Sequence, residues 1–153
     1  MKAGDICNRE VIVTRPEAPV VEAARLMRTH HVGDLVVVRD GGAEHVPIGI
    51  LTDRDIALCV DRLIQRPQMK VADVMSVELV TADEQEELHE VLKKMQLGGI
   101  RRMPVVDRLG ILVGILTLDD VIELLSEELT DLVKLVAAEQ RRERVQRTAA
   151  SAG

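Results

Sequence analysis

One seven-residue phrase occurs twice in the chain, as GILTDRD from Gly49 and as GILTLDD from Gly114. The similarity continues backwards, because LVVVRD aligns with MPVVDR and VVEAARLMRTHHVG aligns with LHEVLKKMQLGGIR. Still earlier, VIVT lies near ELVT in the alignment, and DGGAEHVP holds about three extra residues in the first copy. Internal similarity of this kind predicts two copies of one structural unit, stacked to share a core.

Each copy is predicted to form a strand, a helix, two strands and a second helix. A β-branched run opens the copy, and the first helix carries apolar residues at helical spacing. These residues are Val20, Val21, Ala24 and Met27 in the first copy and Leu88, Val91, Leu92 and Met95 in the second. Two apolar runs then form a hairpin, with turns at the Gly-Gly pair of the first copy and at DRLG in the second.

The hairpin runs are apolar throughout, as in LVVV, which indicates strands that are covered on both faces. A single copy would leave an apolar sheet face exposed to water. We therefore expect an α/β (α+β) fold in which the two β-α-β-β-α repeats pack face to face about a pseudo-two-fold axis.

The chain is predicted to divide into repeats at residues 5–64 and 76–130, a linker at 65–75 that contains Pro67, and an extension at 131–153. From Leu118 to about Arg147 the sequence lacks Gly and Pro, and its apolar residues recur every three or four positions. This predicts an extended C-terminal helix, about 45 Å long for thirty residues. Past Val136 the sequence turns polar, and we expect the end to fray.

The amino-acid composition restricts the kinds of ligand and partner that the chain can bind. Phe, Tyr and Trp are all absent, so a planar ligand must be held between aliphatic side chains and backbone. A net charge of −6 argues against nucleic acid as a partner, and the Arg-rich tail at 141–147 is interleaved with Glu, as in a solvated helix end. The sequence lacks both a membrane-spanning apolar window and an apolar signal-peptide core, so we expect a cytoplasmic protein without membrane contact.

Other kinds of site find little support in the sequence. Cys7 and Cys59 stand far apart and are expected to be free or buried thiols. The four histidines lack the spacing of metal ligands, so we expect no metal. Motifs for a catalytic serine or a phosphate-binding loop are absent, so we expect no enzyme activity and no catalytic residue.

The repeated phrase places a Thr-x-x-Asp pattern where a strand ends and a helix begins, at Thr52 and Asp55 and again at Thr117 and Asp120. One interpretation is a capping box, in which the Asp side chain bonds back to the Thr backbone. The other is a ribose clamp, because a carboxylate accepts hydrogen bonds from two adjacent sugar hydroxyls while the helix N-terminus offers amides to an anion. The two interpretations are compatible.

Together, VGDLVVVRD with GILTDRDI and GIRRMPVVD with GILTLDDVI resemble a tandem pair of cystathionine-β-synthase (CBS) domains, also called a Bateman module, over roughly residues 5–130. The resemblance implies that AMP, ADP, ATP or S-adenosylmethionine binds in clefts between the repeats, as a regulatory ligand rather than a cofactor. It also implies a homodimer, shaped as a flat disc, that reports to an unidentified effector enzyme or transporter.

The resemblance also assigns candidate ligand contacts. Thr52 and Asp55 would hold the ribose in one cleft, and Thr117 and Asp120 would hold it in the other. Phosphate contacts are expected from Arg54, and from Arg101 and Arg102, which precede the Met-Pro step at Pro104. Backbone near Thr14 and Thr81, taken as the ends of the first strand in each copy, would contact the base.

The two clefts are expected to differ. Leu118 replaces the Arg54 anchor in the second copy, while Gly33 and Asp34 stand in the first copy where the second has Arg101 and Arg102. Because Asp34 would repel a phosphate, binding at a single site or asymmetric binding is expected.

These observations favour a non-catalytic sensor module, in which the C-terminal helix is an output lever or a dimer strut. The main alternative is a purely structural dimerisation module that binds no ligand. An enzyme built on this fold, or a DNA-binding regulator that uses the Arg-rich tail, are further alternatives that the sequence supports less well.

Overall fold

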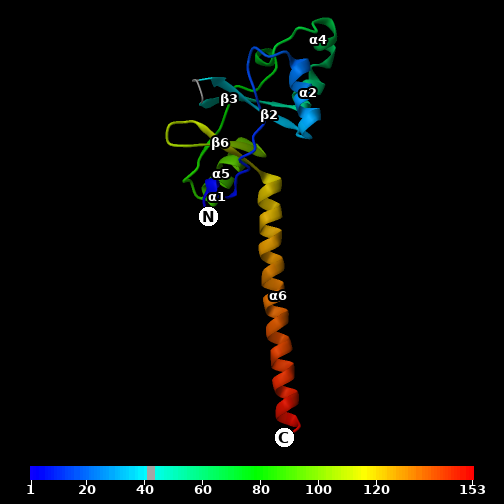
Figure 1. The fold of residues 1–153 in the computed structure, drawn as a ribbon, viewed down its shortest axis with the longest axis vertical. Helices are drawn as coiled ribbons and strands as arrows, with labels where there is room; N and C mark the ends of the chain where they lie inside the picture. The colour runs from blue at the N-terminus through cyan, green and yellow to red at the C-terminus, as the bar shows by residue number, and fades with distance from the viewer. Residues whose placement is uncertain (41–43) are drawn as a thin grey trace. The chain divides into compact units, whose positions relative to one another are not determined.

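The computed structural model describes residues 1–40 and 44–153, and it divides into two compact units, Met1–Thr117 and Leu118–Gly153 (Figure 1). The first unit contains both sheets, and the second is a single helix, α6 (Leu118–Ser151). The Gly-Gly turn expected in the first copy falls at residues 41 and 42, outside the described residues.

Each repeat forms a three-stranded sheet with the same topology. The first sheet comprises β1 (Val13–Thr14), β2 (Asp34–Asp40) and β3 (His45–Thr52), and the second comprises β4 (Ala82–Asp83), β5 (Arg102–Val106) and β6 (Leu112–Thr117). In both, the first strand runs parallel to the second, which pairs antiparallel with the third. Helices α2 (Val20–His30) and α5 (Leu88–Gly98) join the parallel strands, and α3 (Asp53–Leu58) and α4 (Val60–Gln65) follow β3. The predicted β-α-β-β-α order is confirmed.

The hairpin turn of the second repeat is stabilised by Asp107. Its Oδ1 atom accepts hydrogen bonds from the backbone N–H groups of Leu109 and Ile111, at 2.8 and 2.9 Å. Gly110 has a φ of +78°, in the left-handed region that favours glycine. The turn predicted from DRLG is therefore confirmed.

Strand β2 is buried on both faces, as its apolar run predicted. On one face, Leu35 and Val37 belong to a core cluster with Ala23 and Met27 of α2. On the other, Val36 and Val38 pack with Ile115 of β6. This second cluster is the apolar seam between the repeats.

The buried stripe of α2 differs by one position from the expected one. Val20, Ala23 and Met27 are buried, whereas Val21 is 37% exposed. Steps of three and four residues keep a side chain on one face of a helix, while a step of one turns it by about 100°. Val21 is therefore directed away from the stripe that begins at Val20.

The repeat extends further towards the N-terminus than the sequence alignment suggested. MKAGDI (Met1–Ile6) and MKVADV (Met69–Val74) form matching short helices, α1 (Ala3–Ile6) and η1 (Val71–Asp73). In both, the backbone N–H of the lysine donates to an aspartate Oδ2, at 3.1 Å in the first and 3.0 Å in the second. The segment assigned to a linker therefore contains the start of the second repeat.

The two repeats exchange these opening segments. The N–H of Ala3 donates to the carbonyl of Glu86 in the second repeat, and the N–H of Val71 donates to the carbonyl of Ala18 in the first, each at 2.8 Å. Asn8 pairs with Ile115 of β6, and Ser76 pairs with Ile50 of β3, both as antiparallel bridges. The exchange is reciprocal, as a pseudo-two-fold relation between the repeats requires.

Helix α6 runs for 34 residues, which corresponds to about 50 Å. It continues to Ser151, so the fraying expected after Val136 is not seen in the structure. Ala, Glu, Gln and Arg dominate this part and favour the helix, and the hydroxyl of Thr148 donates to the carbonyl of Arg144 at 2.9 Å. Among the described residues, no helix has both the length and the apolar character needed to cross a membrane.

Both cysteines are free thiols, as expected. Burial raises the pKa of the Cys7 thiol above its ordinary value.

Candidate functional site

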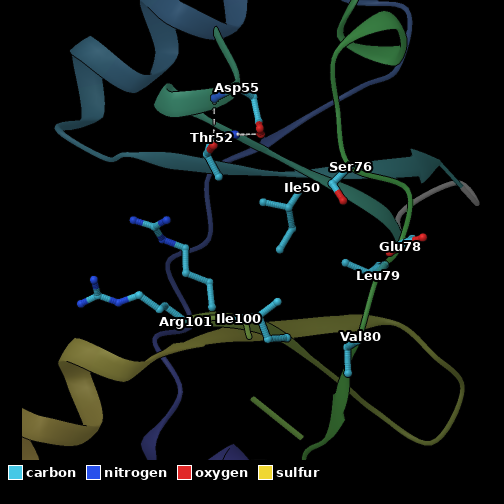
Figure 2. Close-up of a pocket in the computed structure, with 10 residues that line it drawn as sticks. Ile50, Thr52, Asp55, Ser76, Glu78, Leu79, Val80, Ile100 and Arg101 are labelled. Carbon is cyan, nitrogen blue, oxygen red and sulfur yellow. Dashed lines mark hydrogen bonds between the residues drawn. The ribbon is translucent and has the colours of Figure 1, made fainter. Parts of the chain in front are cut away.

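A pocket of about 210 Å³ lies between the two repeats (Figure 2). It is lined from the first repeat by the end of β3 and the start of α3, and from the second by residues before β4 and at the start of β5. The lining residues are Ile50, Thr52, Asp55, Ser76, Glu78, Leu79, Val80, Ile100, Arg101 and Arg102.

Thr52 and Asp55 form one wall of the pocket through a capping box. Thr52 ends β3 in extended conformation and is the N-cap of α3. Its N–H donates to Asp55 Oδ2 at 2.8 Å, and the N–H of Asp55 donates to Thr52 Oγ1 at 3.1 Å. The capping interpretation is therefore confirmed, and the same two half-buried side chains line the pocket (Figure 2).

Arg101, which directly precedes β5, and Arg102, which begins it, bring positive charge to the same pocket. Arg101 is exposed. The Nε atom of Arg102 lies 2.6 Å from Asp34 Oδ2, where β2 of the other repeat begins. The pocket thus joins the Asp55 carboxylate of the first repeat with the Arg101 and Arg102 guanidinium groups of the second.

Aliphatic side chains form the centre of the pocket. In Figure 2, Ile50 from the first repeat and Ile100 from the second extend towards each other. Leu79 and Val80 line the side formed by the segment that leads into β4. A flat apolar group could be held between these side chains. Because the chain has no Phe, Tyr or Trp, aliphatic side chains take the place of an aromatic ring against such a group.

Four other candidate residues lie outside the lining of this pocket. Arg54 is exposed on α3, where its backbone N–H donates to Asp53 Oδ1. Pro104 is buried within β5, and Thr14 is buried in β1.

Thr81, the fourth, precedes β4, which comprises Ala82 and Asp83, so the prediction that it ends the first strand is wrong. In the sheets, Thr14 pairs with Val37 and Ala82 pairs with Val105. Because β2 and β5 are equivalent at an offset of 68, Ala82 is the counterpart of Thr14, whereas the alignment of VIVT with ELVT used 67.

The second Thr-x-x-Asp pattern spans the boundary between the two compact units. Thr117 is the last residue of β6 in the first unit. Asp120 lies in the first turn of α6 in the second unit.

Sequence reasoning missed six lining residues: Ile50, Ser76, Glu78, Leu79, Val80 and Ile100. The similarity between MKAGDI and MKVADV was the signal that could have located the segment 76–80 within a repeat. Among the described residues, no group of three or more potential metal ligands is found.

The sequence model of the CBS domain matches this chain twice, at residues 3–61 and 71–127. The protein MK0525 of Methanopyrus kandleri is 37% identical over 124 residues, which cover 80% of this chain and 62% of that protein. This chain thus spans less than two thirds of that relative's length.

Solved structures of CBS domains share the fold. The CBS domain pair of protein MJ0100, in complex with 5′-methylthioadenosine and S-adenosyl-L-methionine, superposes with a TM-score of 0.71 at 27% identity, over 84% of this chain and 98% of that one. The cytosolic domain of the Mg²⁺ channel MgtE, in complex with ATP, superposes with a TM-score of 0.68 at 28% identity, over 80% of this chain and 48% of that one. The chain therefore belongs to the CBS domain family and carries two copies of the domain.

Proposed function

We propose that this protein is a non-catalytic regulatory module that binds an adenosine nucleotide in the pocket between its two CBS domains. The observation that carries the proposal is the composition of that pocket, which joins Thr52 and Asp55 of one domain with Arg101 and Arg102 of the other. The ligands of the MJ0100 pair and of the MgtE domain share an adenosine group, which supports the same ligand class here.

The proposed binding mode assigns each part of the ligand to a wall of the pocket. Among the described residues, Asp55 accepts a hydrogen bond only at Oδ2, so Oδ1 can accept from the ribose hydroxyls. The adenine ring would lie among Ile50, Ile100 and their aliphatic neighbours. Phosphates would extend to Arg101, because a guanidinium forms strong charge-assisted hydrogen bonds with phosphate oxygens.

Regulation would follow from a ligand that contacts both domains at once. Such a ligand favours the arrangement of the domains in which all its contacts are made. The size of the response is limited by the difference in affinity between the two arrangements. The partner that detects the change is proposed to be an effector enzyme or transporter.

Titration calorimetry with ATP, AMP and S-adenosylmethionine tests the proposal. We expect at least one of them to bind, and Asp55→Asn to weaken binding about 10- to 100-fold, since a hydrogen bond to a charged group contributes about 1.5–3 kcal/mol. Asn keeps an oxygen that can accept the capping bond from Thr52, so the fold should survive.

Asp73→Asn is the matched control, because Asp73 accepts the same kind of capping bond in η1 and lies outside the pocket. Its affinity should equal that of the unmodified protein. If none of the three ligands binds at millimolar concentration, the proposal fails and a purely structural module is favoured.

A further inference from the structure

Helix α6 exposes a stripe of large apolar side chains along its first half. The members of the stripe are between 48% and 62% exposed. They are Ile122, Leu125, Leu129, Leu132, Val133 and Val136. Apart from Val133, they follow alternating steps of three and four residues, as the a and d positions of a heptad repeat do. A seam with this spacing fits against one neighbouring helix along its length.

The positions that border the stripe carry negative charge. Residues three or four positions apart are neighbours on a helix surface, so the border consists of the positions at that distance from a stripe member. Three border positions hold a carboxylate, and none holds Lys or Arg. The carboxylates are those of Asp119, Glu128 and Glu139. Glu128 is exposed and lies near the middle, three residues after Leu125 and four before Leu132.

The whole segment that carries the stripe is acidic. Residues 118–136 contain six acidic side chains and one lysine, so their net charge is −5. The lysine, Lys134, lies 3.0 Å from Asp131 Oδ1 on the same helix. A second copy of the stripe would bring this segment against itself in either orientation and would set like charges together. The charges therefore disfavour a second α6 and favour a helix whose own borders are positive.

We propose that the stripe from Ile122 to Val136 is the docking site of a basic amphipathic helix of another protein. Apolar side chains of that helix cover the stripe, and its Lys or Arg side chains face Glu128 and the other border carboxylates. Apolar burial supplies most of the attraction, and the charges select the partner. The inference does not depend on nucleotide binding, because α6 is a compact unit of its own and the residues that line the pocket all precede it.

Fluorescence anisotropy with synthetic peptides tests the charge selection. The probe is a peptide about three heptads long with leucine at a and d and lysine at e and g, and its twin carries glutamate at e and g. At low ionic strength, the lysine peptide should bind the full chain about 10-fold more tightly than the glutamate peptide, and added salt should reduce the difference. Equal affinities, or no binding of the lysine peptide, would overturn the proposal.

Substitutions in α6 test the location. Leu129→Gln/Leu132→Gln removes two apolar side chains while it keeps helix propensity, and it should weaken binding of the lysine peptide about 100-fold. Glu128→Gln should weaken it about 2- to 5-fold. Leu97→Gln/Leu109→Gln is the matched control, because these leucines are 89% and 79% exposed outside α6, and its affinity should be unchanged. If Leu129→Gln/Leu132→Gln also left the affinity unchanged, the peptide would be bound by charge alone and the proposal would be wrong.

Sedimentation equilibrium of the full chain tests whether a second copy covers the stripe instead. We expect any self-association of the unmodified chain to be the same in Leu129→Gln/Leu132→Gln, because another protein, and not this chain, occupies the stripe. Loss of self-association in that variant would identify the stripe as an interface between copies and contradict the proposal.

Discussion

At the scale of single residues, the ion pair between Asp34 and Arg102 distinguishes the two repeats. The residues are counterparts, since Asp34 begins β2 and Arg102 begins β5, and they carry opposite charges 2.6 Å apart. The Asp34 side chain is 18% exposed, so its charge is only partly screened by water. Asp34 therefore reduces the positive charge that Arg102 offers to the pocket.

We predict that Asp34→Asn strengthens the binding of ATP more than that of adenosine. A charge roughly 8 Å from a phosphate, at an effective dielectric constant of about 40, contributes about 1 kcal/mol. ATP affinity should therefore rise roughly 3- to 10-fold, while adenosine, which has no charge, should bind as before. Calorimetry with both ligands measures the difference.

Asp73→Asn controls for the general change of one unit in net charge. Equal gains for ATP in both variants would point to long-range electrostatics alone. If Asp34→Asn bound ATP more weakly, the main effect of the Asp34 carboxylate would be to orient Arg102 and not to neutralise its charge. The prediction would then be wrong.

At the scale of elements, the glycine of the repeated phrase marks where another part of the chain crosses each hairpin. A Cβ atom at Gly49 would lie 2.6 Å from the carbonyl oxygen of Ser76, and one at Gly114 would lie 2.5 Å from Cys7 Sγ. These contacts are adjacent to the bridges that Ser76 and Asn8 form with β3 and β6. The phrase GILT thus begins with glycine because the opening segment of the other repeat passes over it.

Gly49→Ala is predicted to lower the free energy of unfolding by about 2–3 kcal/mol, the upper part of the range for overpacking. The backbone of Ser76 would have to move. A Cβ atom at Gly114 would also lie 2.9 Å from the carbonyl oxygen of Asn8, so Gly114→Ala should cost a similar amount. Urea denaturation followed by circular dichroism measures both.

Gly98→Ala is the contrasting variant. Gly98 ends α5, and a Cβ atom there meets Ile100 Cγ1 at an ordinary 3.5 Å. Alanine should stabilise the helix by about 0.5–1 kcal/mol. If Gly49→Ala were as stable as Gly98→Ala, the crossing would not constrain the repeated glycine.

The elements that the sequence predicted well are those with strong periodicity. Helices α2 and α5, the hairpin strands and the DRLG turn follow from apolar spacing and turn chemistry. The first strands have two residues each, too few to fix their register, so Thr81 was misplaced by one position. The exchange of opening segments depends on contacts between residues far apart in the chain, as between Ala3 and Glu86, which local patterns do not encode.

At the scale of the whole molecule, the duplicated fold carries two unlike sets of candidate ligand-binding positions. Thr52 and Asp55 were predictable because the phrase repeats. Their grouping with Arg101 and Arg102 could not be predicted from sequence patterns, since it depends on how one repeat packs on the other. The equivalent positions of the first repeat, Gly33 and Asp34, offer no positive charge.

We therefore predict that one nucleotide binds per chain. Native mass spectrometry of the protein with saturating ATP should show a single bound molecule for each subunit. The matched variants Asp55→Asn and Asp120→Asn make the same change at equivalent positions of the repeated phrase. The first should show a clearly smaller bound fraction at the lowest concentration that saturates the unmodified protein, because Asp55 lines the pocket that also holds both arginines. The second should retain it. Two molecules per chain, or loss of binding in Asp120→Asn alone, would show that the unlike charges of the two repeats do not decide which site is occupied.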